Sequence, residues 1–341
     1  MTSAGISVVV CSYNGAARIA HCLTTLCAQR GEHHVEVIVV DDGSSDTTSA
    51  VARRFPVQVI TLPANQGLSS ARNAGIAACS HEMVAFTDDD CVPSENWTAS
   101  LLDVWARAPH GTVGVGGHVV VHSADTFNRR YLSHNNPLAP LELDTTASRG
   151  IVARFLAYFA HRDAPTLPRF VGSMVGANMS YSKSALNDVG GFDDVITFGG
   201  DEEDLARRLR RRFGEHSLFV DPNIEMPHEF EPGLTDTLRR ARAYGRGTGR
   251  EFARNGGIPA VRPTPLMSLL VFMVLAPVSF KWAFVVALTT PLLVFRRWLL
   301  KAVRQHNIAM ALYPAIATAQ EIACNVGVVE GWLKHRGGTR S

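Results

Sequence analysis

Three consecutive aspartates, Asp88–Asp90, follow directly after the apolar run Met83–Phe86. A short apolar run that ends in polar residues is typical of a buried strand, so the carboxylates are expected at the carboxyl end of a strand. Three like charges side by side raise one another's pKa values and destabilise a fold unless something neutralises them. A divalent cation does so, and carboxylates are the ligands that a hard cation prefers. The motif therefore predicts a cation site, with a solvated acidic turn as the alternative.

Short apolar runs alternate with helix-like segments over the first hundred residues. The predicted strands are Ile6–Cys11, Val35–Val40, Val57–Leu62 and Met83–Phe86, and the predicted helices are Arg18–Gln29 and Ser69–Cys79. This alternation is typical of βα units and predicts an α/β fold with a Rossmann-like, mainly parallel sheet and helices on both faces. Ligands of such sheets bind beyond the carboxyl ends of the strands, where Ser12, Asp41, Asp42 and Asp88–Asp90 are expected. From about residue 111 the pattern loosens: Val113–Val121 and Met174–Tyr181 are predicted strands, and Glu203–Phe213 is a predicted helix.

Charge is divided unevenly along the chain. Residues 1–236 have a formal balance of −10, whereas residues 237–341 have a balance of +12. A predicted helix, Thr235–Arg254, carries six arginines, and its glycines at 245, 247 and 249 are expected to loosen its middle. Such asymmetry indicates that the C-terminal region meets an anionic surface. A nucleic acid could supply that surface, but the neighbouring apolar run makes a membrane the simpler partner, so no nucleic acid is expected.

That apolar run, Leu266–Phe295, is interrupted only by Pro277, Lys281 and Pro291. One helix of this length would be about 45 Å long, too long for one upright membrane span, yet the run is too short for two spans. A tilted span, a re-entrant hairpin broken near Lys281 and an interfacial helix pair all fit, and a buried helical pair of a soluble domain is the alternative. Basic residues on both sides favour a hairpin or monotopic attachment at the cytoplasmic face of the membrane. Ile308–Val329 is expected to be an amphipathic helix that packs on the protein or lies at the lipid surface.

The six cysteines have no metal-ligand spacing, and several lie in apolar runs. A thiol in such a place behaves as a small apolar side chain, so the cysteines are expected to be reduced in a cytosolic setting. Met1–Ser7 has no basic and apolar leader pattern, so no signal peptide is expected.

Two further motifs precede the three aspartates. Asp41–Ser44 ends the second predicted strand, where a carboxylate can accept hydrogen bonds from a nucleotide base or ribose. In the segment from Asn65 to Gly75, Asn65 and Gly67 suit a tight turn, and Arg72 lies one turn into a predicted helix. A guanidinium there can bind a phosphate through two hydrogen bonds, with a surface salt bridge as the alternative.

A second group of acids, Asp201–Asp204, precedes a run of arginines. Acids in the first turn and bases in the last turn stabilise a helix, which alone would explain the pattern. The functional alternative is that one carboxylate serves as a general base in the crevice. His228 is a candidate metal or phosphate contact, or else a surface histidine.

Taken in order, these motifs resemble family 2 glycosyltransferases. The resemblance rests on Ser7–Gly15, Val39–Asp46, Asn65–Gly75, Asp88–Asp90, Gly176–Met179, Gly190–Asp193 and Asp201–Leu205, and it covers about residues 5–235. It implies a GT-A fold, a nucleotide-sugar donor such as a UDP- or GDP-sugar, a divalent metal (Mn²⁺ or Mg²⁺) and single displacement with inversion. It also implies a glycosyltransferase domain at 1–235, in which 1–110 binds the nucleotide and 111–235 the acceptor. A basic helical linker at 236–262 and a membrane-associated helical tail at 263–341 would follow.

The motifs and the resemblance together assign roles to residues. Nucleotide-sugar contacts are expected from Ser12, Asn14, Asp41, Asp42, Asn65, Gly67, Arg72, Asp88 and Asp89, and metal contacts from Asp88, Asp90 and His228. The base of the family is usually the aspartate of a Glu-Asp pair, but here the order is Asp201-Glu202. Alignment to the following Asp204-Leu205 favours Glu202 as the base, with Asp201 second.

The acceptor is less constrained. Processive synthases of this family carry a Gln-x-x-Arg-Trp motif, whereas here Val294 precedes Arg297-Trp298, so transfer of a single sugar is expected. The basic, apolar tail suggests a lipid-linked acceptor and a role in cell-envelope glycolipid or polysaccharide synthesis. A sugar-phosphate nucleotidyltransferase and a non-catalytic membrane scaffold are the alternatives. The first would need a glycine-rich basic loop after the first strand, which Cys11–Gly15 lacks.

Overall fold

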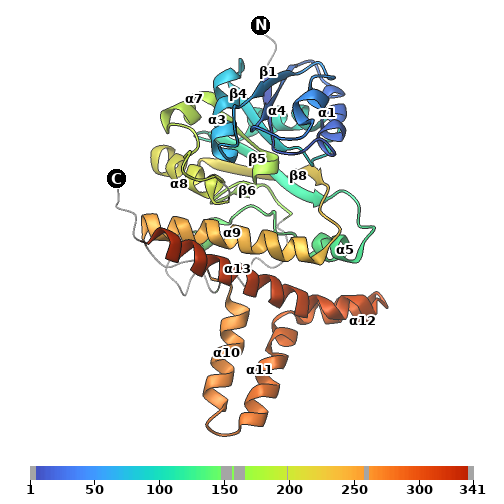
Figure 1. The fold of residues 1–341 in the computed structure, drawn as a ribbon, viewed down its shortest axis with the longest axis vertical. Helices are drawn as coiled ribbons and strands as arrows, with labels where there is room; N and C mark the ends of the chain where they lie inside the picture. The colour runs from blue at the N-terminus through green and yellow to red at the C-terminus, as the bar shows by residue number, and fades with distance from the viewer. Residues whose placement is uncertain (1–4, 147–155, 157–165, 198, 257–260, 337–341) are drawn as a thin grey trace. The chain divides into compact units, whose positions relative to one another are not determined.

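The computed structural model describes residues 5–146, 156, 166–197, 199–256 and 261–336. The chain divides into two compact units, each of which is described by itself. The first comprises residues 1–124 and 138–230, and the second comprises residues 125–137 and 231–341. Figure 1 shows the secondary-structure elements of both.

An eight-stranded sheet forms the centre of the first unit, in the order β3-β2-β1-β4-β7-β5-β8-β6. Its strands are β1 (Gly5–Ser12), β2 (His34–Asp41), β3 (Gln58–Thr61), β4 (Met83–Asp88), β5 (Gly114–Val121), β6 (Arg169–Phe170), β7 (Met179–Ser182) and β8 (Leu218–His228). The first four strands are parallel to one another, as are β5 and β8, whereas β7 and β6 run antiparallel to their neighbours. The predicted α/β fold is confirmed, and the antiparallel strands all lie in its second half.

Helices cover both faces of this sheet (Figure 1). They are α1 (Ile19–Cys27), α2 (Thr48–Ala52), α3 (Leu68–Ala78), α4 (Trp97–Arg107), α7 (Lys183–Asp188) and α8 (Asp201–Phe213), with 3-10 turns η1 (Leu143–Thr145) and η2 (Gly176–Asn178). Successive strand residues point to opposite faces, so Val9 and Phe86 join a core cluster with α3, α7 and α8. Val8 and Ala85 are fully buried on the other face, which α1 and α4 cover.

The predicted strand Met174–Tyr181 differs from the structure, where the strand begins only at Met179. The side chain of Asn178, which is fully buried, explains the difference. Its Nδ2 donates to the carbonyl oxygens of His118 and Ile224, and its Oδ1 accepts from the indole of Trp97. These three bonds hold the preceding residues in the turn η2.

The second unit is helical. Its elements are α5 (Phe127–His134), α9 (Leu234–Asn255), α10 (Pro263–Leu275), α11 (Phe280–Val294), α12 (Arg296–Arg304), η3 (Ile308–Leu312) and α13 (Tyr313–His335). Short α5 belongs to it because the ring of Tyr131 packs edge-on against Trp298 and Tyr313, with ring centres 6.0 and 5.3 Å away.

The glycines of α9 pack against α13, and the expectation that they loosen the helix was wrong. A Cβ atom on Gly245 would lie 2.0 Å from the carbonyl oxygen of Cys324, and one on Gly249 would lie 2.0 Å from that of Val328. On α13, Gly327 and Gly331 approach the α9 backbone equally closely. Because only glycine lets two helix backbones come so near, these residues join α9 to α13 instead of breaking α9.

Helices α10 and α11 form a hairpin whose turn lies at residues 276–279 (Figure 1). Large apolar side chains stand exposed along both helices, among them Leu270, Val274, Val278, Phe280, Trp282, Phe284, Leu288 and Leu293. Among the described helices, no single one is long and apolar enough to cross a membrane, although the bent pair α11–α12 meets the length and composition that a crossing needs.

Candidate active site

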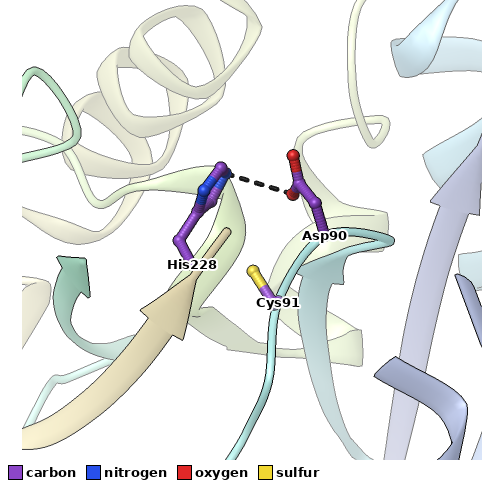
Figure 2. Close-up of side chains that lie close together, drawn as sticks. All are labelled: Asp90, Cys91 and His228. Atoms are coloured by element: carbon purple, nitrogen blue, oxygen red, sulfur yellow. Dashed lines mark ion pairs between the residues drawn. The ribbon is translucent and has the colours of Figure 1, made fainter. Parts of the chain in front are cut away.

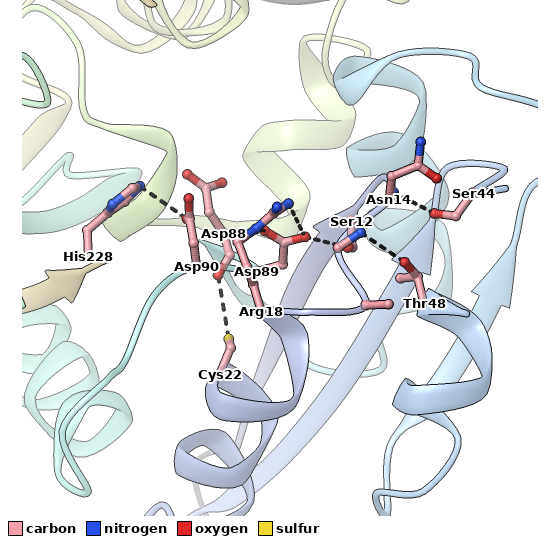
Figure 3. A network of polar contacts seen from close by, with 12 residues as sticks. Ser12, Asn14, Arg18, Cys22, Ser44, Thr48, Asp88, Asp89, Asp90 and His228 are labelled. Atoms are coloured by element: carbon pink, nitrogen blue, oxygen red, sulfur yellow. Dashed lines mark hydrogen bonds and ion pairs between the residues drawn. The ribbon is translucent and has the colours of Figure 1, made fainter. Parts of the chain in front are cut away.

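The loops after β1 and β2 are tied together at the carboxyl edge of the sheet (Figure 3). The backbone N–H of Asn14 donates to Ser44 Oγ at 2.9 Å, and Asn14 Oδ1 accepts from the N–H of Ser45 at the same distance. The N–H of Gly15 donates to Thr48 Oγ1. Asn14 holds a left-handed conformation with φ of 50°. The two loops therefore form one continuous floor at this edge.

Asp41 and Asp42 are both buried and bind backbone groups. Asp41 Oδ1 accepts from the N–H of Ser44 at 3.0 Å. Asp42 accepts from the N–H groups of Gln66 and Gly67 at 2.8 and 2.9 Å, which fixes the turn before α3. Gly67 is required in this turn because its φ of 93° lies in the left-handed region. Asn65 is exposed on the same turn.

Asp89 connects the first two loops to the acid motif. Its carboxylate accepts from Ser12 Oγ and from Arg18 Nε and Nη2, both of the latter at 3.2 Å. Burial raises the pKa of Asp89, and the bonds from Ser12 and the charge of Arg18 counter part of that rise. Asp89 thus connects the acid motif to Ser12 and Arg18. Nothing in the sequence around Arg18 indicated that Arg18 would bind Asp89.

Asp90, Cys91 and His228 form a compact cluster of candidate metal ligands (Figure 2). His228 Nε2 lies 3.1 Å from Asp90 Oδ1, and the candidate ligand atoms of the three residues all lie within 4.8 Å of one another. His228 is only 1% exposed, and its Nδ1 has no hydrogen-bond partner among the described residues. A carboxylate and an imidazole that face each other in this way suit a divalent cation such as Mn²⁺.

Asp88, the first aspartate of the motif, faces Arg72. Burial and the charge of Asp90 raise the pKa of Asp88 to about 6, although Arg72 opposes the shift. Arg72 Nη2 is 3.9 Å from Asp88 Oδ1. The charges of Asp88 and Asp90 destabilise each other, and a bound cation would relieve this repulsion.

Arg72 connects Asp88 to the second group of acids, Asp201 and Glu202. Its Nη1 donates to Asp201 Oδ2, and to Glu202 Oε1 at 3.2 Å. The side chain of Arg72 is 3% exposed, that of Asp201 is 1% exposed and that of Glu202 is 23% exposed. Glu202 is therefore the carboxylate of this pair that a ligand in the crevice can reach. The alternative of a surface salt bridge for Arg72 is excluded.

Burial and the neighbouring charge of Glu202 raise the pKa of Asp201 to about 8, with Arg72 opposing the shift. Asp201 therefore favours the protonated state near neutral pH. The pKa of Arg72 is raised despite its burial because acidic groups surround it, so Arg72 remains a cation. The other carboxylate oxygen of Asp201, Oδ1, has no hydrogen-bond partner among the described residues.

Helix α3 also positions the segment that leads into α8. Asn73 Nδ2 donates to the carbonyl oxygen of Phe192, and Asn73 Oδ1 accepts from its N–H, both at 2.8 Å. Ser69 Oγ donates to the carbonyl oxygen of Ile196, and the Arg72 guanidinium lies 5.2 Å from the ring centre of Phe192. Gly67 is the N-cap residue of α3, and no side chain caps this helix.

With this geometry in view, comparison with known proteins identifies the family. A family description, glycosyl transferase family 2, matches residues 7–190. The chain belongs to glycosyl transferase family 2. The pre-mycofactocin glycosyltransferase of Mycobacterium tuberculosis is 31% identical over 248 residues, which cover 70% of this chain and 46% of that protein. Glycosyltransferase AglE of Haloferax volcanii is 27% identical over 202 residues, 58% of each chain. The chain thus spans about half the length of these family 2 relatives.

Solved structures show the same fold. The mannosyltransferase PcManGT of Pyrobaculum calidifontis, in complex with GDP-Man and Mn²⁺, aligns over 96% of this chain and 87% of its own, with a TM-score of 0.57 and 18% identity. Glucosyl-3-phosphoglycerate synthase of Mycobacterium tuberculosis, with Mn²⁺, UDP and glucosyl-3-phosphoglycerate, aligns over 75% and 82%, with a TM-score of 0.52 and 18% identity. The chain therefore has the GT-A fold of these enzymes.

Most of the residues singled out in the sequence meet at one edge of the sheet. Asp90 and His228 face each other, and Arg72 joins Asp88 to Asp201 and Glu202. Four residues that the sequence motifs did not indicate also belong to the site, namely Arg18, Asn73, Cys91 and Phe192. Cys91 could have been found from its place directly after the aspartates, but a thiol there also fits a packing role.

Proposed function

We propose that the chain transfers one sugar from a nucleoside-diphosphate sugar to an acceptor hydroxyl, with inversion at the anomeric carbon. The observation that carries this proposal is the arrangement around Arg72, where the acid motif and the second acid group converge within one buried ion-pair network. Such a site offers what a single displacement needs: groups that stabilise a leaving diphosphate and a base that activates the incoming hydroxyl.

The donor would lie along the floor formed by the first loops. Ser12, Asn14, Asp41, Asp42, Asn65 and Gly67 line or hold this floor, with Asp88 and Asp89 beside it. Asn65 is exposed there and free to meet a ligand's polar groups, whereas the carboxylates of Asp41 and Asp42 shape the floor through their backbone bonds. The related structures with GDP-Man and with UDP support a donor of either nucleotide class.

A divalent cation would be held by Asp90 and His228, with Asp88 beside them. When bound, the cation would neutralise the charge that develops on the departing diphosphate. The residues fit a divalent cation, because Nδ1 of the buried His228 has no hydrogen-bond partner among the described residues, and because ionised Asp88 and Asp90 destabilise each other.

Glu202 is the proposed base. It is the more exposed of the two acids and lies beside Arg72, which holds its carboxylate in place. Glu202 would take the proton of the acceptor hydroxyl while the hydroxyl oxygen attacks the anomeric carbon and the nucleoside diphosphate leaves. Asp201, with its raised pKa, would remain protonated and lessen the repulsion that Glu202 meets.

The second unit would attach the enzyme to the cytoplasmic face of a membrane, where a lipid-linked acceptor of cell-envelope glycolipid or polysaccharide synthesis is available. The exposed apolar side chains of the α10–α11 hairpin support this proposal, as do the basic residues Arg296, Lys301 and Arg304 on the next helix. Apolar side chains would enter the lipid, and the cations would meet anionic headgroups.

Sedimentation with lipid vesicles tests the attachment. Wild type should sediment with vesicles that contain anionic phosphatidylglycerol, and the double variant Val278→Asp, Trp282→Asp should remain in solution. Arg53→Gln, a change on the first unit, serves as the control and should sediment like wild type. Equal sedimentation of all three proteins would contradict the proposed attachment but leave the proposed transfer reaction intact.

The transfer reaction itself is tested by product analysis. Incubation with UDP- or GDP-sugars and a membrane extract should give a glycosylated product of inverted anomeric configuration. Retention of the donor's configuration would contradict the single displacement.

A further inference from the structure

We propose that Asp90, Cys91 and His228 form a binding site for a thiophilic cation such as Zn²⁺ or Cd²⁺, with Cys91 Sγ as the third ligand. The site shares Asp90 and His228 with the cation site described under the proposed function, and in that respect the inference rests on that function. What is new is a specific role for the thiol: it lets a soft ion compete with the harder catalytic one.

The backbone places the thiol and the imidazole side by side. Cys91 and His228 form an antiparallel bridge pair, in which the N–H of Val92 donates to the carbonyl oxygen of Pro227 and the N–H of Glu229 donates to that of Asp90, both at 2.8 Å. Directly opposed residues of an antiparallel pair carry their side chains on the same face. Figure 2 shows the result, with the thiol beneath the gap between carboxylate and imidazole.

The cluster is buried and its imidazole is held. Cys91 is fully buried, and His228 and Asp90 are 1% and 9% exposed. The ring of Phe230 packs against His228 with ring centres 4.4 Å apart. Ligands that cannot rotate into solvent lose little freedom when a cation binds, which favours binding.

The three ligand types, carboxylate, thiolate and imidazole, distinguish hard from thiophilic cations. Mg²⁺ and Mn²⁺ prefer oxygen ligands, whereas Zn²⁺ binds thiolate, imidazole and carboxylate in one site. On binding, the Sγ–H bond of Cys91 breaks, a bond from sulfur to the cation forms and the proton passes to solvent, with no change of oxidation state. Because Asp90 and His228 would be engaged, a bound Zn²⁺ would exclude the harder ion and inhibit the enzyme.

Titration with Cd²⁺ tests the site, because a thiolate bound to Cd²⁺ absorbs in the ultraviolet. Cys27 is an exposed thiol and would interfere, so all proteins carry Cys27→Ser. The parent protein should develop the band with one equivalent of Cd²⁺, and Cys91→Ser should abolish it and weaken Cd²⁺ binding by about tenfold or more. Cys22→Ser is the matched control, since this buried thiol donates to the Asp88 carbonyl oxygen but lies outside the cluster; it should keep the band.

A band that persists in Cys91→Ser, or that is absent from the folded parent, would overturn the inference. If Cys91→Ser does not fold, judged by circular dichroism, Cys91→Ala replaces it. Titration of UDP and GDP with Mn²⁺ into the same proteins separates the two proposals. Metal-dependent nucleotide binding without a Cd²⁺ band overturns only the thiol site, whereas a band without nucleotide binding overturns only the proposed function.

Discussion

Arg72 on α3 donates a buried hydrogen bond to Asp201 at the start of α8, although 129 residues separate them in the sequence. The pair connects the half of the sheet that carries the acid motif to the helix that carries the proposed base. Since Asp88 and Glu202 also face Arg72, one guanidinium contacts three acidic side chains.

Replacing Arg72 should therefore destabilise the first unit strongly. Arg72→Met leaves the buried Asp201 without its hydrogen-bond donor, and Asp88 and Glu202 without their counter-charge, which together cost about 3–5 kcal/mol of unfolding free energy. Arg107→Met is the matched control: Arg107 is half exposed, and its partner Asp221 keeps hydrogen bonds from Asn223, so the loss should be about 1 kcal/mol or less. Urea unfolding measures both, and losses of equal size would show that the Arg72 network is no more important than a peripheral ion pair.

Stability should depend on pH through Asp201. Its folded-state pKa, raised to about 8 by burial and by Glu202, exceeds the ordinary aspartate value of 3.8, so the folded protein keeps a proton that the unfolded chain has lost. This contribution to stability is fully present below about pH 4 and is lost as the pH rises through about 8, at no more than about 1.4 kcal/mol per pH unit. A carboxylate whose folded-state pKa is lowered would have the opposite effect, because its contribution to stability is lost as the pH falls.

Urea unfolding at pH 5, 6.5 and 8 measures this dependence. The stability of Asp201→Asn relative to wild type should increase from pH 5 to pH 8, because the amide cannot ionise. The control Asp221→Asn should show no such trend in this range, since the pKa of Asp221 is lowered by Asn223 and Arg107 despite its burial. A constant difference between Asp201→Asn and wild type would mean that Asp201 is ionised throughout.

Glu202 should be required for turnover and not for donor binding. Glu202→Gln keeps the shape of the side chain but cannot accept a proton, so kcat should fall by about 10²–10⁴ while the affinity for the nucleotide changes little. Glu203→Gln, one residue further along α8, should retain kcat within about twofold. If Asp201→Asn lowers kcat more than Glu202→Gln does, the roles of the two acids are reversed.

The fold and the site were predictable from the sequence to different degrees. The alternation of apolar runs with helices, ending in Ser12, Asp41 and Asp88, is a local signal, and the structure places these residues at one edge of the sheet. Strand β6, the antiparallel direction of β7 and the late start of β7 were not predictable, because they depend on contacts with distant residues such as those of Asn178.

Partners of site residues were the least predictable feature. Arg72 has a local pattern that fits phosphate binding equally well, and only the folded chain shows that its guanidinium faces Asp201. The glycines of α9 show the same limit, because a glycine that breaks a helix and one that lets another helix pack closely look alike in sequence. Their role became clear from Gly327 and Gly331 on α13.

The most direct test of the central claim is calorimetric titration of UDP and of GDP, each with and without Mn²⁺, into wild type and Asp90→Ala. One of the two nucleotides should bind wild type only when Mn²⁺ is present. Asp90→Ala, although folded, should lose this binding. Metal-independent binding of equal strength in both proteins, or no binding of either nucleotide to folded wild type, would contradict the account.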